Sequence, residues 1–182
     1  AFGHVDGAGR FAITGVMPGR YTFTISGADA RGWVLDGATI PAAPGSSVAE
    51  RDVFNLPFEV TDGLDITDAT ISMTRAASTL QVLVEDIGDR PVGSLGVVLF
   101  SADPKHWYAG SRRVLSQRVD PKGAVTFEDL PKGDYVVATV AGMQPPNWYI
   151  GRGLDALAAT GTKVRLEPSE TRAITVRIVP KA

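Results

Sequence analysis

One sequence pattern occurs twice in this chain, and it constrains the fold more than any other feature. Its first copy spans residues 6–21 and its second copy spans residues 120–135, so the offset is 114 positions (120 − 6). An internal repeat of this length indicates two copies of one domain rather than a solenoid of short units. Between the two copies, only the proline of the motif departs from this offset, and it does so by one position. The residues that match at this offset are Gly9 and Gly123, Val16 and Leu130, Gly19 and Gly133, and Tyr21 and Tyr135.

The first copy of the pattern has little sequence in front of it. About 43 residues of strand-like sequence (80–122) precede Gly123, whereas only eight residues precede Gly9. We therefore expect a partial domain over residues 1–77, lacking most of its leading strands, and a complete domain over residues 78–182. Either the sequence is cut from a longer chain, or a neighbouring chain supplies the missing strands. Because uncovered strand edges promote aggregation, the second alternative predicts assembly by β-strand complementation.

The composition excludes several classes of function. The formal net charge is −2 over 182 residues, so a nucleic-acid partner gains no electrostatic support. The sequence contains no cysteine, which excludes a disulfide framework, a thiolate nucleophile and a cysteine metal site. No apolar run approaches the roughly 18 residues that a membrane span requires. We expect no cofactor, no metal and no membrane span.

The apolar pattern is typical of β-strands almost throughout. Leu80, Val82 and Val84 alternate with polar neighbours, and residues 95–100 form an apolar run typical of a buried strand. Short strands separated by turns predict an all-β fold of tandem seven-stranded Greek-key sandwiches, related to prealbumin-like or Ig-like folds, with the first N-terminally incomplete. The only helical pattern covers residues 154–159. The remaining strands are expected at 10–14, 20–26, 58–60, 66–73, 112–119, 125–127, 135–139, 163–167 and 171–179, with a flexible insertion at 41–48.

The repeated motif also carries a family resemblance. The pattern Gly-x-Phe-x-Ile-x-x-Val-x-Pro-Gly-x-Tyr at residues 9–21 resembles the carboxypeptidase regulatory-like domain, a transthyretin-like (prealbumin-like) β-sandwich. The second copy departs from it, with Val125 in the first aromatic position and one residue between Pro131 and Gly133. The segment 51–57 is similar to stretches in large secreted proteins of soil bacteria. The resemblance implies non-catalytic modules on exported or cell-surface bacterial proteins.

The motif residues have a structural interpretation that does not depend on the family. Glycine at the hairpin allows a positive φ, and the Pro-Gly pair sets the next chain reversal. The apolar members are expected to point between the sheets, while each tyrosine hydroxyl reaches backbone at the rim. The predicted structural residues are Gly9, Phe11, Ile13, Pro18, Gly19, Tyr21, Gly123, Phe127, Pro131, Gly133 and Tyr135.

The sequence contains little evidence of catalytic or metal-binding motifs. The two histidines, His4 and His106, lie in no metal-ligand pattern, and neither a Gly-x-Ser-x-Gly elbow nor a phosphate loop occurs. Asp62, Asp65 and Asp68 lack the ligand spacing of a calcium loop and are better explained as turn caps and a solvent-facing strand. We therefore predict that the chain is not an enzyme.

Two aromatic clusters are the candidate binding residues. Exposed rings beside hydrogen-bonding side chains can stack on the CH groups of a sugar and pair with its hydroxyls. The alternative is that one ring of each cluster plugs the end of the sandwich. In a further alternative, Arg112 and Arg113 stack on these rings or pair with acidic residues of a partner. The candidate residues are Trp107, Tyr108, Arg112, Arg113, Trp148 and Tyr149.

These observations leave three functional hypotheses open. The first is a non-catalytic extracellular or cell-envelope structural module of a bacterium, a subunit of a surface filament or stalk joined by strand complementation. The second is a carbohydrate-binding module, and the third is an accessory domain of a larger secreted enzyme or outer-membrane transporter. The expected partners are protein, by self-association or a neighbouring domain of the same polypeptide, and glycans.

Overall fold

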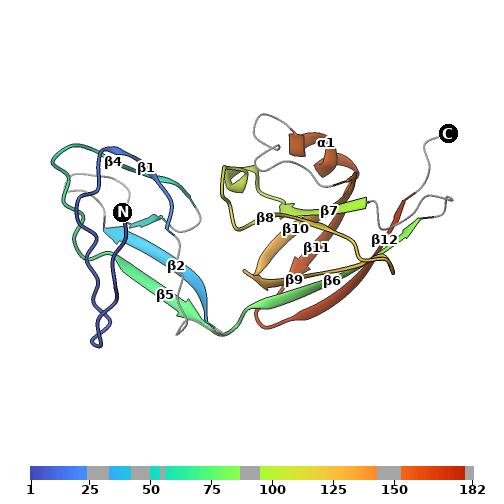
Figure 1. Cartoon of the computed structure of the whole chain (residues 1–182), viewed down its shortest axis with the longest axis horizontal. Helices are drawn as coiled ribbons and strands as arrows, with labels where there is room; N and C mark the ends of the chain where they lie inside the picture. Colours follow the sequence, from blue (N-terminus) through green and yellow to red (C-terminus); the bar gives the residue numbers. More distant parts are fainter. Residues whose placement is uncertain (24–32, 42–49, 54–55, 87–94, 143–152, 179–182) are drawn as a thin grey trace. The chain divides into compact units, whose positions relative to one another are not determined.

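The computed structural model describes residues 1–23, 33–41, 50–53, 56–86, 95–142 and 153–178 (Figure 1). The chain divides into two compact units. Unit 1 comprises Ala1–Gly27 and Gly37–Ser72, and unit 2 comprises Ala28–Asp36 and Met73–Ala182. Among the described residues, no helix has the length and apolar character needed to cross a bilayer. The domain boundary expected between residues 77 and 78 stays a prediction.

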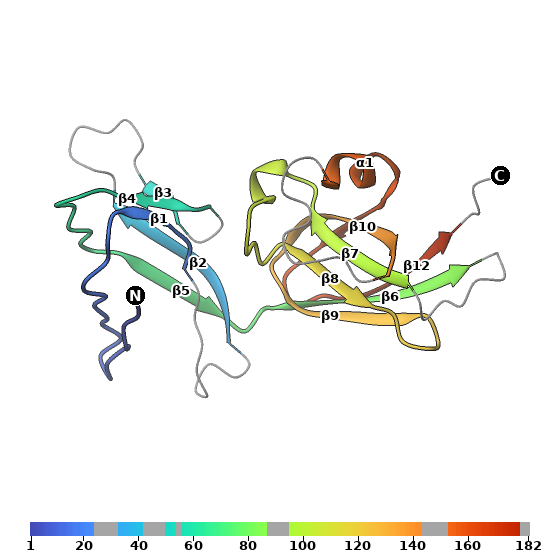
Figure 2. The same ribbon diagram turned by 45° about the horizontal axis from the view of Figure 1, so that its top comes forward.

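Unit 2 contains two sheets that face each other (Figures 1 and 2). All neighbouring strands are antiparallel except β12 and β6, which run parallel. The predicted all-β sandwich is confirmed, and the described strands lie within a few residues of the predicted ranges. One sheet has the order β11 (Thr162–Leu166), β10 (Gly133–Ala141), β7 (Leu95–Ser101) and β8 (Val114–Arg118); the other has the order β12 (Thr171–Ile178), β6 (Ser78–Asp86) and β9 (Ala124–Leu130).

The core of unit 2 follows from the alternation of side chains along its strands. Every residue of β7 is buried, because this strand has packed neighbours on both faces. Its odd-numbered residues, such as Val97 and Leu99, join the main core between the sheets. Its even-numbered residues Val98 and Phe100 pack on the outer face with Leu154. Leu154 belongs to the helix α1 (Gly153–Thr160), which confirms the predicted helical segment and covers that outer face.

The parallel pairing of β12 with β6 is the longest continuous register in unit 2. It runs through eight residue pairs, from Thr171 opposite Thr79 to Ile178 opposite Asp86. Arg177 lies opposite Glu85 in this register, and its Nε is 3.1 Å from the Glu85 carboxylate. The first and last strands of unit 2 are therefore joined side by side.

Unit 1 contains two small sheets. A two-stranded sheet pairs β1 (Gly19–Tyr21) with β4 (Phe58–Val60), and a three-stranded sheet has the order β3 (Glu50–Asp52), β2 (Val34–Pro41) and β5 (Thr70–Thr74), with β2 and β5 each extending past the division between the units. Ala38, Ile40, Val53 and Val60 are buried there. The strand predicted at 58–60 is confirmed.

Three predictions for unit 1 need correction. The strand expected at 10–14 is reduced to a single bridge between Val5 and Phe11, since no neighbouring strand in the described residues pairs with it. β2 was not predicted, because Asp36, Gly37 and Pro41 interrupt its apolar pattern. β5 begins at Thr70, later than the predicted residue 66. The predicted insertion at 42–48 lies outside the described residues, while Pro41 itself ends β2.

Candidate functional site

The turn that opens the motif has the same geometry in both copies. The Asp6 Oδ1 atom accepts hydrogen bonds from the amides of Ala8 and Arg10, both at 2.9 Å. The Asp120 Oδ1 atom accepts equivalent hydrogen bonds from Lys122 and Ala124, both at 2.8 Å. The glycine three residues after each aspartate has a positive φ, 78° in the first copy and 85° in the second, which confirms the predicted role of Gly9 and Gly123.

The motif tyrosines also repeat their contacts. The Tyr21 hydroxyl donates a hydrogen bond to the carbonyl of Met17 at 2.7 Å, and the Tyr135 hydroxyl donates one to the carbonyl of Pro131 at 2.8 Å. The strands that carry them pair alike. Tyr21 lies opposite Phe58 on β4, and Tyr135 lies opposite Val164 on β11. The sequence motif therefore specifies one local structure in both units.

The two copies differ in burial. In unit 2, Val119 is 3% exposed, and its counterpart in unit 1, Val5, is 65% exposed. Three further members of the second copy are buried, and all three counterparts in the first copy are half-buried. These further pairs are Phe127 with Ile13, Leu130 with Val16, and Tyr135 with Tyr21. The expectation that the motif residues fill an interior thus holds for the second copy and only in part for the first.

The cover over the second copy comes from two strands. β6 pairs with β9, and β7 pairs with β10, and their apolar residues fill the core against the motif. Among the described residues of unit 1, no strand takes the place of β6 or β7. Without such a strand among the described residues, apolar side chains of the first copy stay partly exposed to solvent, and we call this surface the open face. It consists of Val5, Phe11, Ile13, Val16 and Tyr21.

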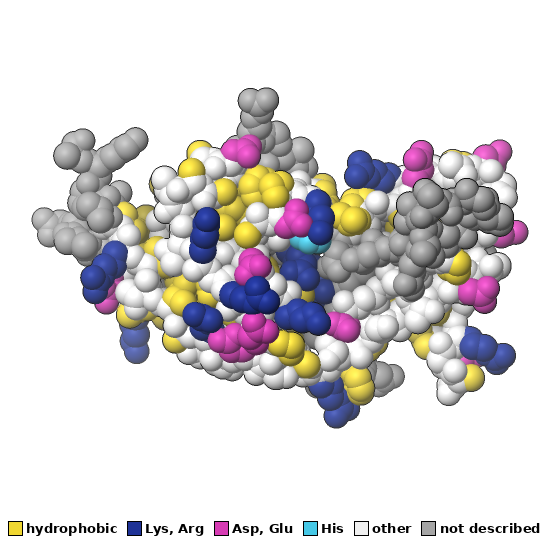
Figure 3. Space-filling view, turned by 180° about the vertical axis from the view of Figure 1, so that it is seen from behind, with side chains coloured by type: hydrophobic (Ala, Val, Ile, Leu, Met, Phe, Trp, Pro, Cys, Tyr) yellow, Lys and Arg dark blue, Asp and Glu magenta, His cyan; other side chains and the backbone are white. Residues whose placement is uncertain are grey.

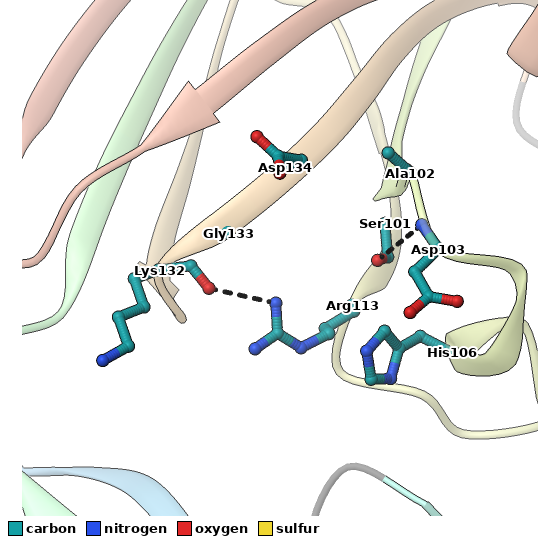
Figure 4. Close-up of a pocket in the computed structure, with 8 residues that line it drawn as sticks. All are labelled: Ser101, Ala102, Asp103, His106, Arg113, Lys132, Gly133 and Asp134. Carbon is teal, nitrogen blue, oxygen red and sulfur yellow. Dashed lines mark hydrogen bonds between the residues drawn. The ribbon is translucent and has the colours of Figure 1, made fainter.

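A pocket of about 420 Å³ lies at the rim of unit 2 (Figure 4). The Arg113 guanidinium donates hydrogen bonds to the Lys132 carbonyl and to the Tyr135 hydroxyl, both at 3.2 Å. Gly133 has a φ of 147°, and a Cβ there would lie 2.9 Å from Arg113 Nη1. The positive φ favours glycine at this position, which lies beside the Arg113 guanidinium. The residues that line the pocket are Ser101, Ala102, Asp103, His106, Arg113, Lys132, Gly133 and Asp134.

Charges of both signs surround this pocket. Asp103 pairs with Lys105 at 2.8 Å, and Asp134 lies 3.6 Å from Arg165. The hydrogen bond from the Lys105 side chain holds the pKa of Asp103 below its usual range. Figure 3 shows Lys and Arg side chains interspersed with Asp and Glu around the histidine on this side of unit 2. Such a mixture lacks the single-sign surface that a nucleic-acid partner needs.

Burial shifts two ionisable groups beside the pocket. It lowers the pKa of Arg112 to about 10, with the charge of the adjacent Arg113 acting in the same direction. Burial also raises the pKa of Tyr135, while the charge of Arg113 opposes that shift. Both groups are thus partly withdrawn from water at the rim of the sandwich.

The pocket contains the residue types of a serine hydrolase in a different arrangement. In a catalytic triad the carboxylate orients the histidine, which in turn accepts the serine proton. Here the Asp103 carboxylate caps the 3₁₀ turn η3 (Pro104–His106) through the Lys105 amide at 3.1 Å. The Ser101 hydroxyl accepts a hydrogen bond from the Asp103 amide at 3.2 Å. Among the described residues, no cluster of three or more His, Asp or Glu side chains is placed to hold a metal ion.

The structure places only part of the predicted aromatic site. The Trp107 indole donates a hydrogen bond to the Ser101 carbonyl at 2.7 Å, and its ring packs edge-on against Phe100 at 5.6 Å. Tyr108 and Arg112 are half-buried. Trp148 and Tyr149 lie outside the described residues, so the convergence of the two clusters stays a prediction. Sequence reasoning missed Val5, although its match to Val119 follows from the offset between the copies.

The fold defines a β-sandwich protein. No family model matches the chain, and no curated protein matches it. A DUF3823 family protein from Parabacteroides merdae is 18% identical, with 57% of this chain and 46% of that chain covered and a TM-score of 0.36. A minor pilin of Streptococcus agalactiae is 16% identical, with coverages of 69% and 61% and a TM-score of 0.36.

A major pilin of Bacillus cereus is 9% identical, with 70% of this chain and 35% of that chain covered and a TM-score of 0.38. The chain thus spans between 35% and 61% of the length of these three structures.

Proposed function

We propose that this chain is a non-catalytic structural module of the bacterial cell exterior that assembles with other polypeptides through the open face of unit 1. The observation that carries the proposal is the difference in burial between matched residues. Val5 is 65% exposed where Val119 is 3% exposed, although the surrounding turns have the same hydrogen bonds. The first copy has the side chains of a sandwich core, and no strand in the described part of unit 1 covers them as β6 and β7 cover the second copy.

Covering the open face is energetically favourable. Burying an aliphatic or aromatic side chain contributes about 1.5–3 kcal/mol, and the half-buried residues of the open face have part of that gain still available. An added strand also supplies main-chain hydrogen bonds, so its affinity does not depend on side chains alone. The open face therefore favours a protein partner that contributes extended chain.

The proposed location and form rest on the sequence motif and on geometry. The motif resembles a domain found on exported bacterial proteins, which favours the cell surface or the extracellular space. A head-to-tail contact that does not close into a ring produces a fibre, and this supports a filament or stalk. The absence of catalysis is supported by the pocket, where the Asp103 carboxylate is engaged in capping a turn.

Sedimentation velocity over a range of concentrations tests the proposal. We expect the isolated chain to associate in a concentration-dependent way, because an uncovered apolar face is prone to self-association. Ile13→Asp should abolish this association by placing a charge on the open face. Thr14→Asp is the matched control, since Thr14 is an exposed neighbour of the half-buried Ile13. A protease-resistant monomer at every concentration, with strongly protected amides at Phe11–Ile13, would contradict the proposal.

Carbohydrate binding is the second candidate function. The observation in its favour is the open, polar pocket that reaches His106, directly before Trp107 and Tyr108 in the chain. A glycan array probed with the intact chain tests it, with Tyr108→Ala as the variant and Tyr21→Ala as an aromatic control in unit 1. Glycan binding lost in the first variant and retained in the second supports this function, whereas no binding to any glycan excludes it.

A further inference from the structure

We infer that the open face accepts an extended segment of a neighbouring polypeptide in one register, antiparallel to Phe11–Ile13 and with alternating apolar side chains. The inference rests on the proposed function and specifies the chemistry of the partner. It follows from unit 2, where the strand that covers the same motif is present. The register of that strand can be transferred to unit 1 through the offset of 114 residues between the two copies.

The template for the partner segment is β6. In unit 2, Leu80 lies opposite Phe127, Gln81 opposite Thr126 and Val82 opposite Val125. The positions 114 residues before these β9 residues are Ile13, Ala12 and Phe11. The partner therefore has an apolar residue opposite Ile13, a polar residue opposite Ala12 and a second apolar residue opposite Phe11.

A second strand of the partner has a place along β1. In unit 2, β10 has β11 on one edge and β7 on the other, with Tyr135 opposite Ser101 on β7. In unit 1, β1 pairs with β4, and no described strand pairs with its other edge. The chain continues from β1 to Phe23, whose ring stacks on Phe58 at 5.2 Å. Among the described strands, the edge of β1 that corresponds to the β7 edge of β10 is therefore unpaired, and we assign the second strand of the partner to it.

Unit 2 of a second copy of this chain is a poor source of this segment. The chain has suitable strands of its own, but β6 and β7 fill the core of unit 2, where Leu80, Val97 and Leu99 are all 0% exposed. A second copy could donate them only by opening its own unit 2. We assign the segment instead to a polypeptide that has a free pair of strands of the same alternating type.

Disulfide trapping of a probe peptide tests the register. The chain has no cysteine, so one engineered thiol reports on one position. The probe is the nine-residue segment Ser78–Asp86 with Gln81→Cys, added to the full chain with Ala12→Cys. Thr14→Cys is the matched control, because it lies two residues, roughly 7 Å, further along the same side of the strand. The Ala12→Cys chain should cross-link at least about tenfold faster, since a disulfide requires Cβ atoms within about 4.5 Å.

The pattern of side chains in the probe is tested with a second peptide. Leu80→Thr and Val82→Thr together place strand-favouring β-branched residues at both positions but remove the apolar pair, and we expect this peptide to lose the preference for Ala12→Cys. Adding Ile13→Asp to the Ala12→Cys chain should also remove this preference, because it replaces the apolar residue of the chain instead of those of the peptide. Equal cross-linking rates at both positions, or an unchanged preference with the substituted peptide, would overturn the inferred register.

Two further outcomes separate this inference from the proposed function. If no peptide cross-links while the chain still self-associates through Ile13, the proposed function stands and the inferred partner is wrong. If neither cross-linking nor self-association occurs, the proposed function fails as well. A chain carrying both Ala12→Cys and Gln81→Cys tests donation by a second copy: disulfide-linked chain dimers joined between these two positions without peptide, together with faster amide exchange in β6, would identify a second copy as the donor and overturn the assignment to a different polypeptide.

Discussion

Tyr21 and Tyr135 make the same hydrogen bond in two different surroundings. Each hydroxyl donates to the carbonyl four residues earlier, at 2.7 Å and 2.8 Å respectively. Tyr135 is buried under β6 and β7, whereas Tyr21 is half-buried. The local geometry is therefore set by the motif itself, and burial is set by the strands that cover it. Matched substitutions in the two copies can separate these contributions.

Replacing each tyrosine by phenylalanine measures the hydrogen bond in the two surroundings. Tyr135→Phe should lower the free energy of unfolding of unit 2 by about 1–2 kcal/mol, because it leaves the Pro131 carbonyl and an Arg113 donor without this partner in a buried place. Tyr21→Phe should cost less than about 0.5 kcal/mol, since water can replace its hydroxyl. Urea denaturation of each variant provides the measurement. Equal losses would mean that the two hydroxyls are equally shielded from water.

Shortening the matched valines tests the open face by a chemically identical change. Val119→Ala should destabilise unit 2 by about 2 kcal/mol, because it removes buried methyl groups and leaves a cavity. Val5→Ala should change stability by less than about 0.5 kcal/mol, as expected for an exposed position. Thermal and denaturant unfolding of both variants provide the comparison. A loss at Val5 as large as that at Val119 would show that the isolated unit 1 already covers its face.

Removing the indole nitrogen of Trp107 tests whether its ring supports the fold. Trp107→Phe keeps an aromatic ring against Phe100 but loses the hydrogen bond to the Ser101 carbonyl. We expect a loss of about 1 kcal/mol in the unfolding free energy of unit 2, measured by denaturation. A variant as stable as the parent chain, yet impaired in binding a glycan, would instead make Trp107 a ligand contact.

The shifted pKa of Tyr135 predicts how unit 2 responds to alkaline pH. Burial raises this pKa, so the unfolded chain loses its proton first, near its ordinary value of about 10. Between that value and the higher folded pKa, the folded state binds more protons, and the unfolding free energy falls as the pH rises. Tyr135→Phe should flatten this part of the curve. Denaturation of both chains from pH 9 upwards, about where tyrosine begins to ionise, provides the measurement.

The sequence predicted unit 2 well because its strands alternate clearly and are separated by turn residues. Leu80, Val82 and Val84 specified one face of β6, and the apolar run of β7 indicated a strand buried on both sides. The tyrosine contact at the rim also followed from the motif. Unit 1 was predicted less well. A strand forms only where a neighbour completes its hydrogen bonds, and the residues around Phe11 have no such neighbour in the described chain.

The candidate surfaces could be predicted only in part. Exposed aromatic residues were expected to mark a site, but the packing of Trp107 on Phe100 cannot be deduced from local sequence. The open face was implied by the position of the first motif, yet its extent could be described only from the exposure of Val5 in the structure. The close approach of Arg113 to Gly133 could be seen only in the structure, since the two residues are distant in sequence.

The parallel pairing of β12 with β6 determines how unit 2 responds to mechanical tension. A pull applied at the start of β6 and at the end of β12 drags the two strands past each other along their length. All eight paired positions then resist together, instead of opening one after another as in a peeled hairpin. A filament or stalk built from such units would sustain stretching by shear, so rupture should start elsewhere than between its first and last strands.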